Sequence, residues 1–443
     1  MKSIVVLGAG RSSSALINYL LDYARQHNVA VVVGDVSEAA AQSRIGEHPS
    51  GKAIAFDITD PESSSETISK SDIVVSLLPP HYHADVAELC LEHGKHLVTA
   101  SYVSDDMRAL DQQARDQSLI FLNECGLDPG IDHMSAMQVI DRIKAEGHKI
   151  TTFQSFTGGV IAPETDPGNP WRYKFTWNAR NVVMAGQSTA KYLSDGKFKF
   201  IPYQQLFQRI TPVVVPEHGE FEGYANRDSL KYINEYRLGD VRTMLRGTLR
   251  YKGFCSAWNI LVQLGCCDDT YEMENVGALT HRDFLNCFFD GQSHEEIEGK
   301  VMRRFSLSED GGEIQRLRWS GLFDADKVGL EKGSPAAILE HILNKKWTMK
   351  PSDKDFVVMW HRFGWEQGGA EKFIEASLVV KGEDAVNTAM ARTVGLPLGI
   401  AARLILENKI QSRGVLIPSS REFYEPILVE LKTLGIELTE RQV

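Results

Sequence analysis

The stretch Ile4-Val5-Val6-Leu7-Gly8-Ala9-Gly10-Arg11-Ser12-Ser13 decides the fold. An apolar run ends in a Gly-x-Gly turn, and residues 14–21 follow with the apolar spacing of a helix. In such a unit Gly8 permits the turn, Gly10 lets the backbone approach a pyrophosphate, and amides at the helix start face that anion. Ser13 stands where the fingerprint has its third glycine, and a tight turn without a ligand is the alternative interpretation. The pattern indicates a dinucleotide site formed by Gly8, Gly10, Arg11, Ser12 and Ser13.

The same unit repeats along the first third of the chain. Helical patterns alternate with apolar runs at residues 4–7, 29–33, 53–56, 73–78, 96–100 and 119–122. Runs that are apolar almost throughout are typical of parallel strands buried on both faces. The sequence therefore predicts an α/β fold with a Rossmann-type, doubly wound parallel sheet covered by helices.

The pattern changes after Gly147. Longer strand-like runs appear at 150–157 and in a hairpin of 356–361 with 373–380 around the turn at 367–369. Helical spacing dominates between about residues 268 and 350. We expect a second α/β domain with a mixed sheet, interrupted by a helical insert.

Composition excludes several classes of protein. The 443 residues carry 48 Lys and Arg against 59 Asp and Glu, a net charge of −11 that disfavours nucleic-acid binding. No run approaches the roughly 20 apolar residues of a membrane span. Six cysteines without a C-x-x-C pair are expected to be reduced thiols, and the start of the chain lacks the pattern of a secretory signal. These features predict a cytoplasmic protein.

Further candidate ligand-binding residues stand at the ends of three more strands of the predicted sheet. Asp35 ends the second, where a carboxylate would bind ribose hydroxyls and repel a 2′-phosphate, which favours NAD(H) over NADP(H). Asp57 follows the third strand, and Leu77 and Leu78 end the fourth, at the edge where open α/β sheets bind ligands. All four are candidate cofactor residues, and ordinary turn chemistry is the alternative for each.

A further cluster follows the fifth and sixth strands. Ser101 and Tyr102 come first, and then the sequence Gly-Leu-Asp-Pro-Gly-Ile-Asp-His at residues 126–133. The Asp-Pro-Gly turn precedes a helical pattern, so these polar side chains are expected beside the nicotinamide crevice. A helix cap for Asp128 and a capping or packing role for His133 are the alternatives.

In the second domain, arginines lie among glycines and aromatic residues. Arg227, Arg246 and Arg250 are the examples. A planar guanidinium grips a carboxylate with two hydrogen bonds, so an acidic substrate is one interpretation and surface ion pairing is the other.

Other chemistries lack their signatures. The sequence has no G-x-S-x-G, H-E-x-x-H or P-loop motif. His81 and His83 could suggest a metal, but no thiolate or carboxylate cluster accompanies them, and a surface helix start is favoured. We predict no metal site.

Together, these motifs resemble the saccharopine reductases, the glutamate-forming saccharopine dehydrogenases. The similarity covers nearly the whole chain and rests on residues 8–10, 99–102, 126–134, 173–177, 226–229, 246–254, 393–397 and 413–416. The resemblance implies a dinucleotide-binding domain of residues 1–128 and 385–443, a substrate-binding and dimerisation domain of 129–267 and 351–384, and a helical subdomain of 268–350. It also implies a homodimer that acts on a small-molecule substrate in lysine metabolism.

The reaction implied is reversible. Saccharopine, a tricarboxylate, is interconverted with L-glutamate and L-2-aminoadipate 6-semialdehyde through an imine, with hydride transfer to or from NAD or NADP. By similarity, the substrate-binding residues are Ser101, Tyr102, Asp128, Arg227, Thr248, Leu249 and Arg250, and Leu127, Asp128 and Pro129 lie beside the nicotinamide. We expect Asp128 and Tyr102 to manage protons as the catalytic residues.

The chain departs from the family at two places. Family members have a cysteine where this chain has Thr157, so a role of that thiol does not transfer. The family often uses NADP(H) with a basic residue after the second strand, whereas Asp35 and Glu38 here favour NAD(H).

Two other functions remain open. A reductase of the carboxynorspermidine type would act on a substrate with fewer carboxylates. The arginines of the second domain argue against this function. A non-catalytic nucleotide-binding sensor would need only the first domain, and the presence of Tyr102, Asp128, Arg227 and Arg250 counts against it.

Overall fold

The computed structural model describes residues 1–443 except 186, 188 and 291–295. The chain divides into two compact units, unit 1 (residues 1–149 and 378–440) and unit 2 (150–377 and 441–443). The helix predicted to open the second domain, α7 (Ile131–Ala145), belongs to unit 1 in this division. The helical segment at 268–350 lies within unit 2. The three-part division stays a prediction.

Unit 1 is built on a seven-stranded sheet in the order β17-β6-β5-β4-β1-β2-β3, whose neighbouring strands pair in parallel. The predicted Rossmann-type fold is confirmed, with β17 as an added edge strand. The strands are β1 (Lys2–Leu7), β2 (Val29–Asp35), β3 (Gly51–Ala55), β4 (Ile73–Ser76), β5 (His96–Thr99), β6 (Ile120–Leu122) and β17 (Gly414–Leu416). The strand order reverses between β1 and β4, and ligands bind at such a switch point in open α/β sheets.

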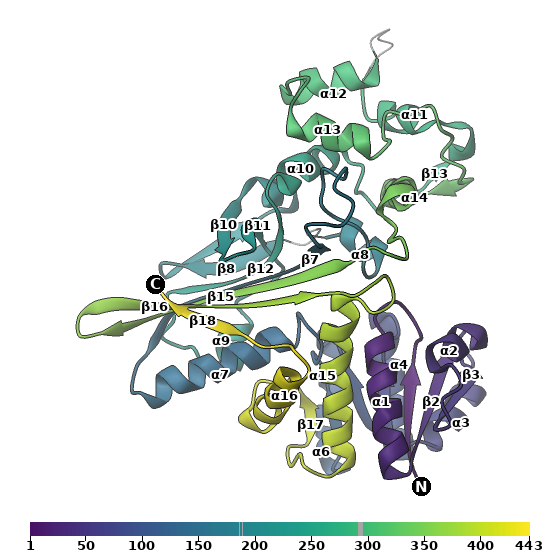
Figure 1. Ribbon diagram of the computed structural model, residues 1–443, viewed down its shortest axis with the longest axis vertical. Helices are drawn as coiled ribbons and strands as arrows, with labels where there is room; N and C mark the ends of the chain where they lie inside the picture. Colours follow the sequence, from purple (N-terminus) through teal and green to yellow (C-terminus); the bar gives the residue numbers. More distant parts are fainter. Residues whose placement is uncertain (186, 188, 291–295) are drawn as a thin grey trace. The chain divides into compact units, whose positions relative to one another are not determined.

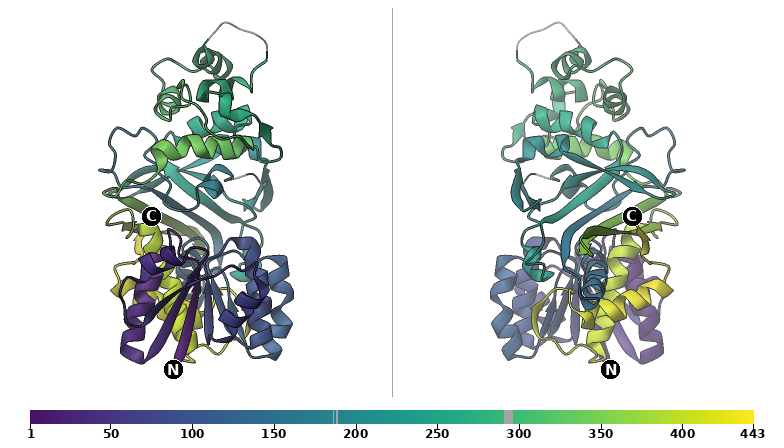
Figure 2. Two further views of the ribbon diagram at one scale, coloured as in Figure 1. Left: turned by 90° about the vertical axis from the view of Figure 1, so that its right-hand side faces the viewer. Right: turned by 90° about the vertical axis from the view of Figure 1, so that its left-hand side faces the viewer.

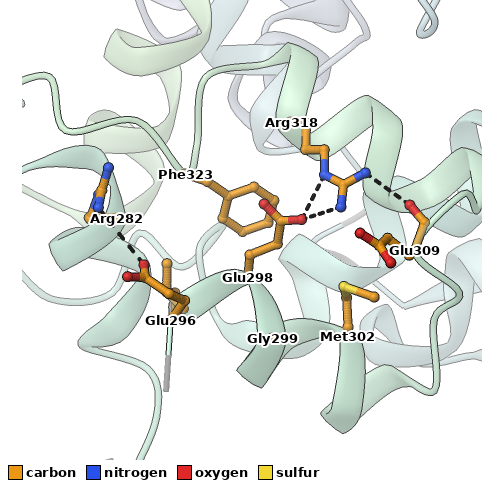
Figure 3. Close-up of a pocket in the computed structure, with 9 residues that line it drawn as sticks. Arg282, Glu296, Glu298, Gly299, Met302, Glu309, Arg318 and Phe323 are labelled. Carbon is orange, nitrogen blue, oxygen red and sulfur yellow. Dashed lines mark hydrogen bonds and ion pairs between the residues drawn. The ribbon is translucent and has the colours of Figure 1, made fainter. Parts of the chain in front are cut away.

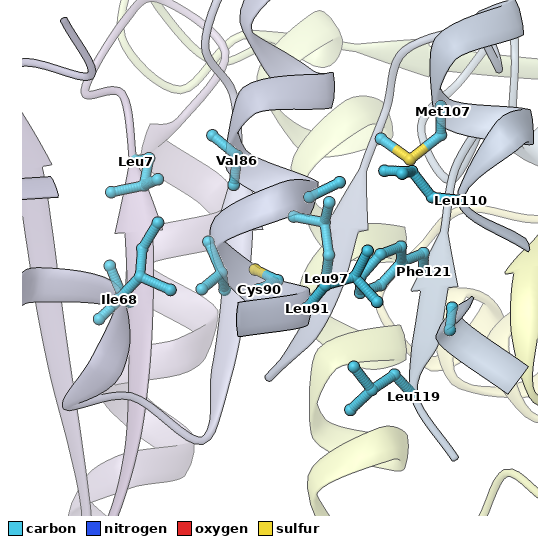
Figure 4. Close-up of a cluster of buried hydrophobic side chains, with 14 of the residues drawn as sticks. Leu7, Ile68, Val86, Cys90, Leu91, Leu97, Met107, Leu110, Leu119 and Phe121 are labelled. Atoms are coloured by element: carbon cyan, nitrogen blue, oxygen red, sulfur yellow. The ribbon is translucent and has the colours of Figure 1, made fainter. Parts of the chain in front are cut away.

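Helices lie on either side of this sheet, as Figure 2 shows. They are α1 (Ser14–His27), α2 (Glu38–Ile45), α3 (Pro61–Ser69), η1 (Pro80–Tyr82), α4 (His83–His93), α5 (Asp105–Ala109), α6 (Asp111–Asp116), α7, α15 (Ala389–Leu406) and α16 (Arg421–Thr433). Side chains of α3, α4, α5 and α6 pack on the sheet in a buried apolar cluster that includes Ile68, Cys90, Met107 and Phe121 (Figure 4). Val74 of β4 and Leu97 of β5 belong to this cluster, so both strands pack against these helices.

Helix α15 packs against α1 on the other face (Figure 1). A Cβ atom added to Gly395 would lie 2.7 Å from the Leu16 nitrogen, and one on Gly399 would lie 2.6 Å from the Tyr19 ring, so only glycine permits this approach. By length and mean hydropathy α15 could span a membrane, and 83% of its apolar window is buried inside the protein. Packing within unit 1 accounts for its apolar character.

Unit 2 contains a nine-stranded mixed sheet in the order β10-β11-β12-β7-β15-β16-β18, with β8 pairing to β12 and β9 to β8. The strands are β7 (Ile150–Ile161), β8 (Ala190–Ser194), β9 (Lys197–Ile201), β10 (Ile210–Val215), β11 (Gly219–Ala225), β12 (Thr243–Tyr251), β15 (Asp355–Gln367), β16 (Ala370–Lys381) and β18 (Thr439–Gln442). The predicted hairpin is β15–β16, with Gly368 and Gly369 at positive φ in its turn. The second mixed-sheet domain is thereby confirmed.

The remaining elements of unit 2 are mainly helical. They are α8 (Ala179–Val183), η2 (Tyr203–Gln208), α9 (Tyr232–Glu235), α10 (Phe254–Leu264), β13 (Met273–Glu274), η3 (Val276–Ala278), α11 (His281–Asn286), α12 (Ile297–Phe305), α13 (Gly312–Trp319), β14 (Lys332–Gly333) and α14 (Pro335–Trp347). In the described part of residues 268–350 lie the helices α11 to α14, as expected for the helical insert. Thr280 and Asp283 form a capping box that begins α11.

Candidate active site

The Gly-x-Gly loop connects β1 to α1 as the sequence predicts. Gly8 has φ +103°, and a Cβ atom there would lie 3.1 Å from the Leu77 carbonyl oxygen, so a side chain would strain the loop. A Cβ on Gly10 would meet nothing within 4 Å, which leaves open space over the loop. Ser13 takes the place of the third glycine, with φ −87° and its hydroxyl donating to the Gly10 carbonyl at 2.8 Å. The loop therefore fits a pyrophosphate at the start of α1.

Two charged side chains brace this loop. Asp35 accepts hydrogen bonds from the Ala9 amide at 2.8 Å and the Ser37 amide at 3.0 Å. Arg44 donates to the carbonyl oxygens of Ala9 and Gly10, each at 3.3 Å. The carboxylate of Asp35 thus lies beside the loop at the end of β2, where a ribose is bound in this fold.

The other predicted cofactor residues lie at the same edge of the sheet. Arg11 is exposed, Ser12 is partly exposed, and Leu77 and Leu78 are partly buried just after β4. Asp57 is exposed, and hydrogen bonds from the Thr59 hydroxyl and amide hold its pKa below the usual range. Turn chemistry accounts for these contacts of Asp57.

Ser101 lies just after β5 and contacts a buried histidine. Its hydroxyl is 2.8 Å from His83 Nε2, which is 3.2 Å from the Thr99 hydroxyl. His83 Nδ1 is 3.1 Å from the Ser76 hydroxyl. His83 does begin α4 as expected, but only 5% of it is exposed, so the interpretation as a surface residue was wrong.

Tyr102 and Asp128 lie side by side. The Tyr102 hydroxyl donates to Asp128 Oδ1 at 3.2 Å, and both side chains are partly exposed. Leu127 and the buried Pro129 flank Asp128 in a turn that brings Gly126 against Gly130. A Cβ on Gly130 would lie 2.0 Å from the Gly126 carbonyl oxygen, so the turn requires glycine there. The two residues that the sequence analysis assigns to proton transfer are thus in contact.

A buried hydrogen bond between a histidine and a carboxylate supports both loops. Glu124 accepts from His133 Nε2 at 2.8 Å and from the Val103 amide at 3.0 Å. Asp132, also buried, accepts from the Gly130 amide at 2.6 Å. The sequence analysis considered packing for His133 and overlooked Glu124. The sequence signal that could have revealed them is the occurrence of two acidic residues, Glu124 and Asp132, on either side of the Asp-Pro-Gly turn.

In unit 2, Arg250 is buried in an aromatic cage. Its guanidinium carbon lies 4.9 Å from the ring centroid of Tyr173, 5.3 Å from Phe254 and 5.9 Å from Tyr224. Nη1 donates to the Leu249 carbonyl at 2.8 Å, while Nε is buried without a hydrogen-bond partner. None of the described residues forms an ion pair with Arg250. A buried cation of this kind calls for an anionic ligand.

The strand register places the predicted substrate residues that neighbour Arg250. Thr248 on β12 pairs with Thr157 on β7, and Leu249 is fully buried. A Cβ on Gly158 would lie 2.3 Å from the Leu249 carbonyl oxygen, so the glycine allows the close approach of these strands. Arg227 is exposed, at φ +50° just after β11.

The polar face of β7 adds residues that the sequence analysis did not assign to the site. The hydroxyls of Ser155 and Thr157 are buried without hydrogen-bond partners. Register pairs them with Arg246 and Thr248, and side chains of register partners share a face of the sheet. Arg246 itself stacks 4.1 Å over the ring of Tyr232. These groups extend the polar surface beside Arg250.

A cavity of about 400 Å³ lies elsewhere in unit 2, among α11, α12 and α13 (Figure 3). Arg318 pairs with Glu298, and Arg282 lies 3.9 Å from Glu296 across it. It contains none of the predicted site residues.

The Gly-x-Gly loop on a Rossmann sheet and the paired Tyr102 and Asp128 define a nicotinamide-dinucleotide-dependent oxidoreductase. Residues 4–122 match the family described as "Saccharopine dehydrogenase NADP binding domain", and residues 126–436 match "Saccharopine dehydrogenase C-terminal domain". The chain belongs to the saccharopine dehydrogenase family.

Relatives match along the full chain. Saccharopine dehydrogenase [NADP(+), L-glutamate-forming] of Schizosaccharomyces pombe is 33% identical, over 99% of each chain. The mitochondrial alpha-aminoadipic semialdehyde synthase of Bos taurus is 34% identical over 99% of this chain and 47% of its own length. The apo structure of the L-Glu-forming saccharopine dehydrogenase from Saccharomyces cerevisiae superposes with a TM-score of 0.88, at 30% identity and 100% coverage of both chains.

Proposed function

We propose that the protein is an L-glutamate-forming saccharopine dehydrogenase of lysine metabolism. Saccharopine, water and oxidised nicotinamide dinucleotide give L-glutamate, L-2-aminoadipate 6-semialdehyde, the reduced cofactor and a proton, in a reversible reaction. Family membership and the full-length similarity to enzymes of that name support this activity.

The observation that carries the proposal is the burial of Arg250, whose guanidinium forms no ion pair within the described part of the chain, although Glu222 is its register partner on β11. A guanidinium taken out of water without a carboxylate is costly, and a ligand carboxylate supplies both charge and paired acceptors. Saccharopine carries three carboxylates. We assign Arg250, Arg227, Thr248 and Leu249 to binding this substrate in unit 2, and Ser101, Tyr102 and Asp128 in unit 1.

The residues of unit 1 manage protons and orientation. The bound dinucleotide supplies the hydride acceptor or donor, and the Gly8–Ser13 loop holds its pyrophosphate. Asp128 takes a proton from the substrate nitrogen or returns it, and the Tyr102 hydroxyl, bonded to Asp128 Oδ1 at 3.2 Å, orients that carboxylate. Holding the amine and the carbonyl carbon together contributes proximity.

For the cofactor we propose a preference for NAD(H). The relatives are named for NADP(+), but Asp35 places a carboxylate at the end of β2. Two unit charges about 5 Å apart at an effective dielectric of about 20 repel by roughly 3 kcal/mol. Asp35→Asn keeps the oxygen that accepts from Ala9 and removes the charge, so it should raise the NADP:NAD ratio of kcat/KM at least about tenfold. A wild-type preference for NADP would refute this assignment.

The activity is tested by mixing purified protein with saccharopine and NAD or NADP and following the absorbance of the reduced nicotinamide. Turnover establishes the reaction. Tight cofactor binding without turnover would refute it and favour a different reductase substrate or a nucleotide sensor.

We further propose a cytoplasmic homodimer. All six cysteines are free thiols, five of them buried, as suits a reducing compartment. Exposed apolar side chains on β9 and β10, including Phe198, Phe200 and Val214, offer surface for a second copy. Sedimentation of a monomer would contradict the dimer, and fractionation of cells tests the compartment.

A further inference from the structure

His83 bridges the ends of two adjacent strands at the carboxyl edge of the unit 1 sheet. Ser76 ends β4, immediately before Leu77 and Leu78, and Thr99 ends β5, two residues before Ser101. Both imidazole nitrogens contact hydroxyl groups, Nδ1 that of Ser76 and Nε2 those of Thr99 and Ser101. The side chain thus links the cofactor strand to a substrate residue.

His83 is held neutral. Burial lowers its pKa to about 4, and the positive potential of His81 adds to this effect. Its place at the first turn of α4 also disfavours a cation, because the helix dipole is positive there. A neutral imidazole carries a single N–H, so one nitrogen donates and the other accepts.

Three hydroxyl groups hold the imidazole in place. Ser76 and Thr99 are both buried, and each can donate its hydroxyl proton to the ring, Ser76 to Nδ1 at 3.1 Å and Thr99 to Nε2 at 3.2 Å. In either tautomer Nε2 forms a hydrogen bond of 2.8 Å with Ser101 Oγ, which fixes the position of that hydroxyl.

We propose that His83 is a positioning residue that holds the Ser101 hydroxyl where it contacts a substrate carboxylate. This role rests on the proposed function, because Ser101 is assigned to the substrate there. His83 does not touch the reacting atoms. It acts on substrate affinity through Ser101, and the Michaelis constant for saccharopine should respond more than turnover does.

Two substitutions at His83 separate this role from simple packing. The amide of Asn lies where Nδ1 lies and reaches Ser76 only, whereas the longer Gln places its amide where Nε2 lies, near Ser101. His83→Asn should raise the KM for saccharopine about tenfold, as expected for one lost hydrogen bond, with kcat within about threefold. His83→Gln should restore KM to within about threefold of the wild-type value.

Controls come from the two serines. Ser76→Ala removes the partner of Nδ1 and should change KM by less than about twofold. Combining His83→Asn with Ser101→Ala should give no greater rise in KM than Ser101→Ala alone, because residues acting as a unit are not additive. Cofactor dissociation constants and thermal midpoints are measured for each variant.

The outcomes are distinguishable. An unchanged KM in His83→Asn, equal effects of Asn and Gln, or additive effects with Ser101→Ala would each overturn the positioning role while wild-type turnover stands. Wild-type protein that binds its cofactor but neither binds nor oxidises saccharopine would overturn the proposed function, and this role with it.

Discussion

Replacing Arg250 by methionine is expected to weaken substrate binding without destabilising the protein. The guanidinium lies among Tyr173, Tyr224 and Phe254, and none of the described residues forms an ion pair with it. Its stacking contributes about 0.5–2 kcal/mol per ring, part of which the methionine sulfur recovers. A buried charge without an ion-pair partner carries a desolvation cost of several kcal/mol, which an apolar side chain of similar volume removes. The thermal midpoint of Arg250→Met should therefore equal or exceed that of the wild type.

Substrate binding should respond in the opposite direction. Hydrogen bonds to charged groups contribute about 1.5–3 kcal/mol each, so losing a two-point grip on a carboxylate costs about 3–6 kcal/mol. The kcat/KM for saccharopine should fall by about 10²–10⁴, mainly through KM. Arg250→Lys keeps the charge but loses the planar, two-point geometry, so its kcat/KM should lie between the values of the wild type and of Arg250→Met.

Steady-state kinetics and thermal unfolding of the same preparations decide between the two roles of Arg250. A KM within twofold of the wild type would remove Arg250 from the substrate site. A marked fall in the thermal midpoint of Arg250→Met would show that the guanidinium is a structural support, which would refute the reasoning from burial.

Four further predictions follow from the geometry. Arg227→Ala should chiefly raise the KM for saccharopine, by about tenfold, and unchanged saturation kinetics would exclude it from the site. Asp128→Asn should lower kcat at least about a hundredfold with saccharopine binding retained, and an unaltered pH–rate profile would end its assignment to proton chemistry. Gly130→Ala should destabilise unit 1 by about 3 kcal/mol or more, because its Cβ would lie 2.0 Å from the Gly126 carbonyl oxygen; an unchanged denaturation midpoint would contradict this. His83 has a folded pKa of about 4 against an ordinary 6.5, so the unfolded chain binds more protons between these values. The contribution of His83 to the free energy of unfolding should fall by roughly 3 kcal/mol as pH drops from 6.5 to 4 and should not change below pH 4, so denaturation of His83→Gln should lack this part of the slope.

The sheet edge of unit 1 could be predicted from the sequence because its residues follow their strands directly. The end of a parallel strand fixes where the next few residues lie, so the Gly8 loop, Asp35 and the Tyr102–Asp128 pair met at one edge. Local turn chemistry, with glycine at positions 8 and 130, supplied the remaining constraint.

The supporting residues could not be predicted in the same way. His83 contacts Ser101 across two strands, and Glu124 joins His133 to the Val103 amide, so each depends on packing that no local pattern encodes. The histidine that begins α4 looks the same in sequence whether it faces solvent or the sheet. Only the burial of the side chain distinguishes a histidine that faces the sheet from one that faces solvent, and the neighbouring helices and strands determine that burial.

Strand register explains why only part of the polar face of the unit 2 sheet could be predicted from the sequence. Arg246 and Ser155 form one register pair across β12 and β7, and Thr248 and Thr157 form the next. Side chains of register partners share a face, which places these groups on the face that carries Arg250. The hydroxyls of Ser155 and Thr157 have no partner in the protein, and each such buried group costs about 1–3 kcal/mol.

Buried hydroxyl groups without partners on this face lower the stability of the folded protein. A bound ligand rich in hydrogen-bond acceptors and donors would offset that loss. Valine at position 157 should therefore stabilise the protein, because it replaces an unpartnered hydroxyl with a methyl group of nearly the same volume. If that hydroxyl faces the substrate, Thr157→Val should also raise the KM for saccharopine, by about tenfold. Thermal unfolding and saturation kinetics measured together test both effects. A more stable variant with unchanged KM would place the hydroxyl outside the substrate site, and a less stable one would contradict its being unpartnered.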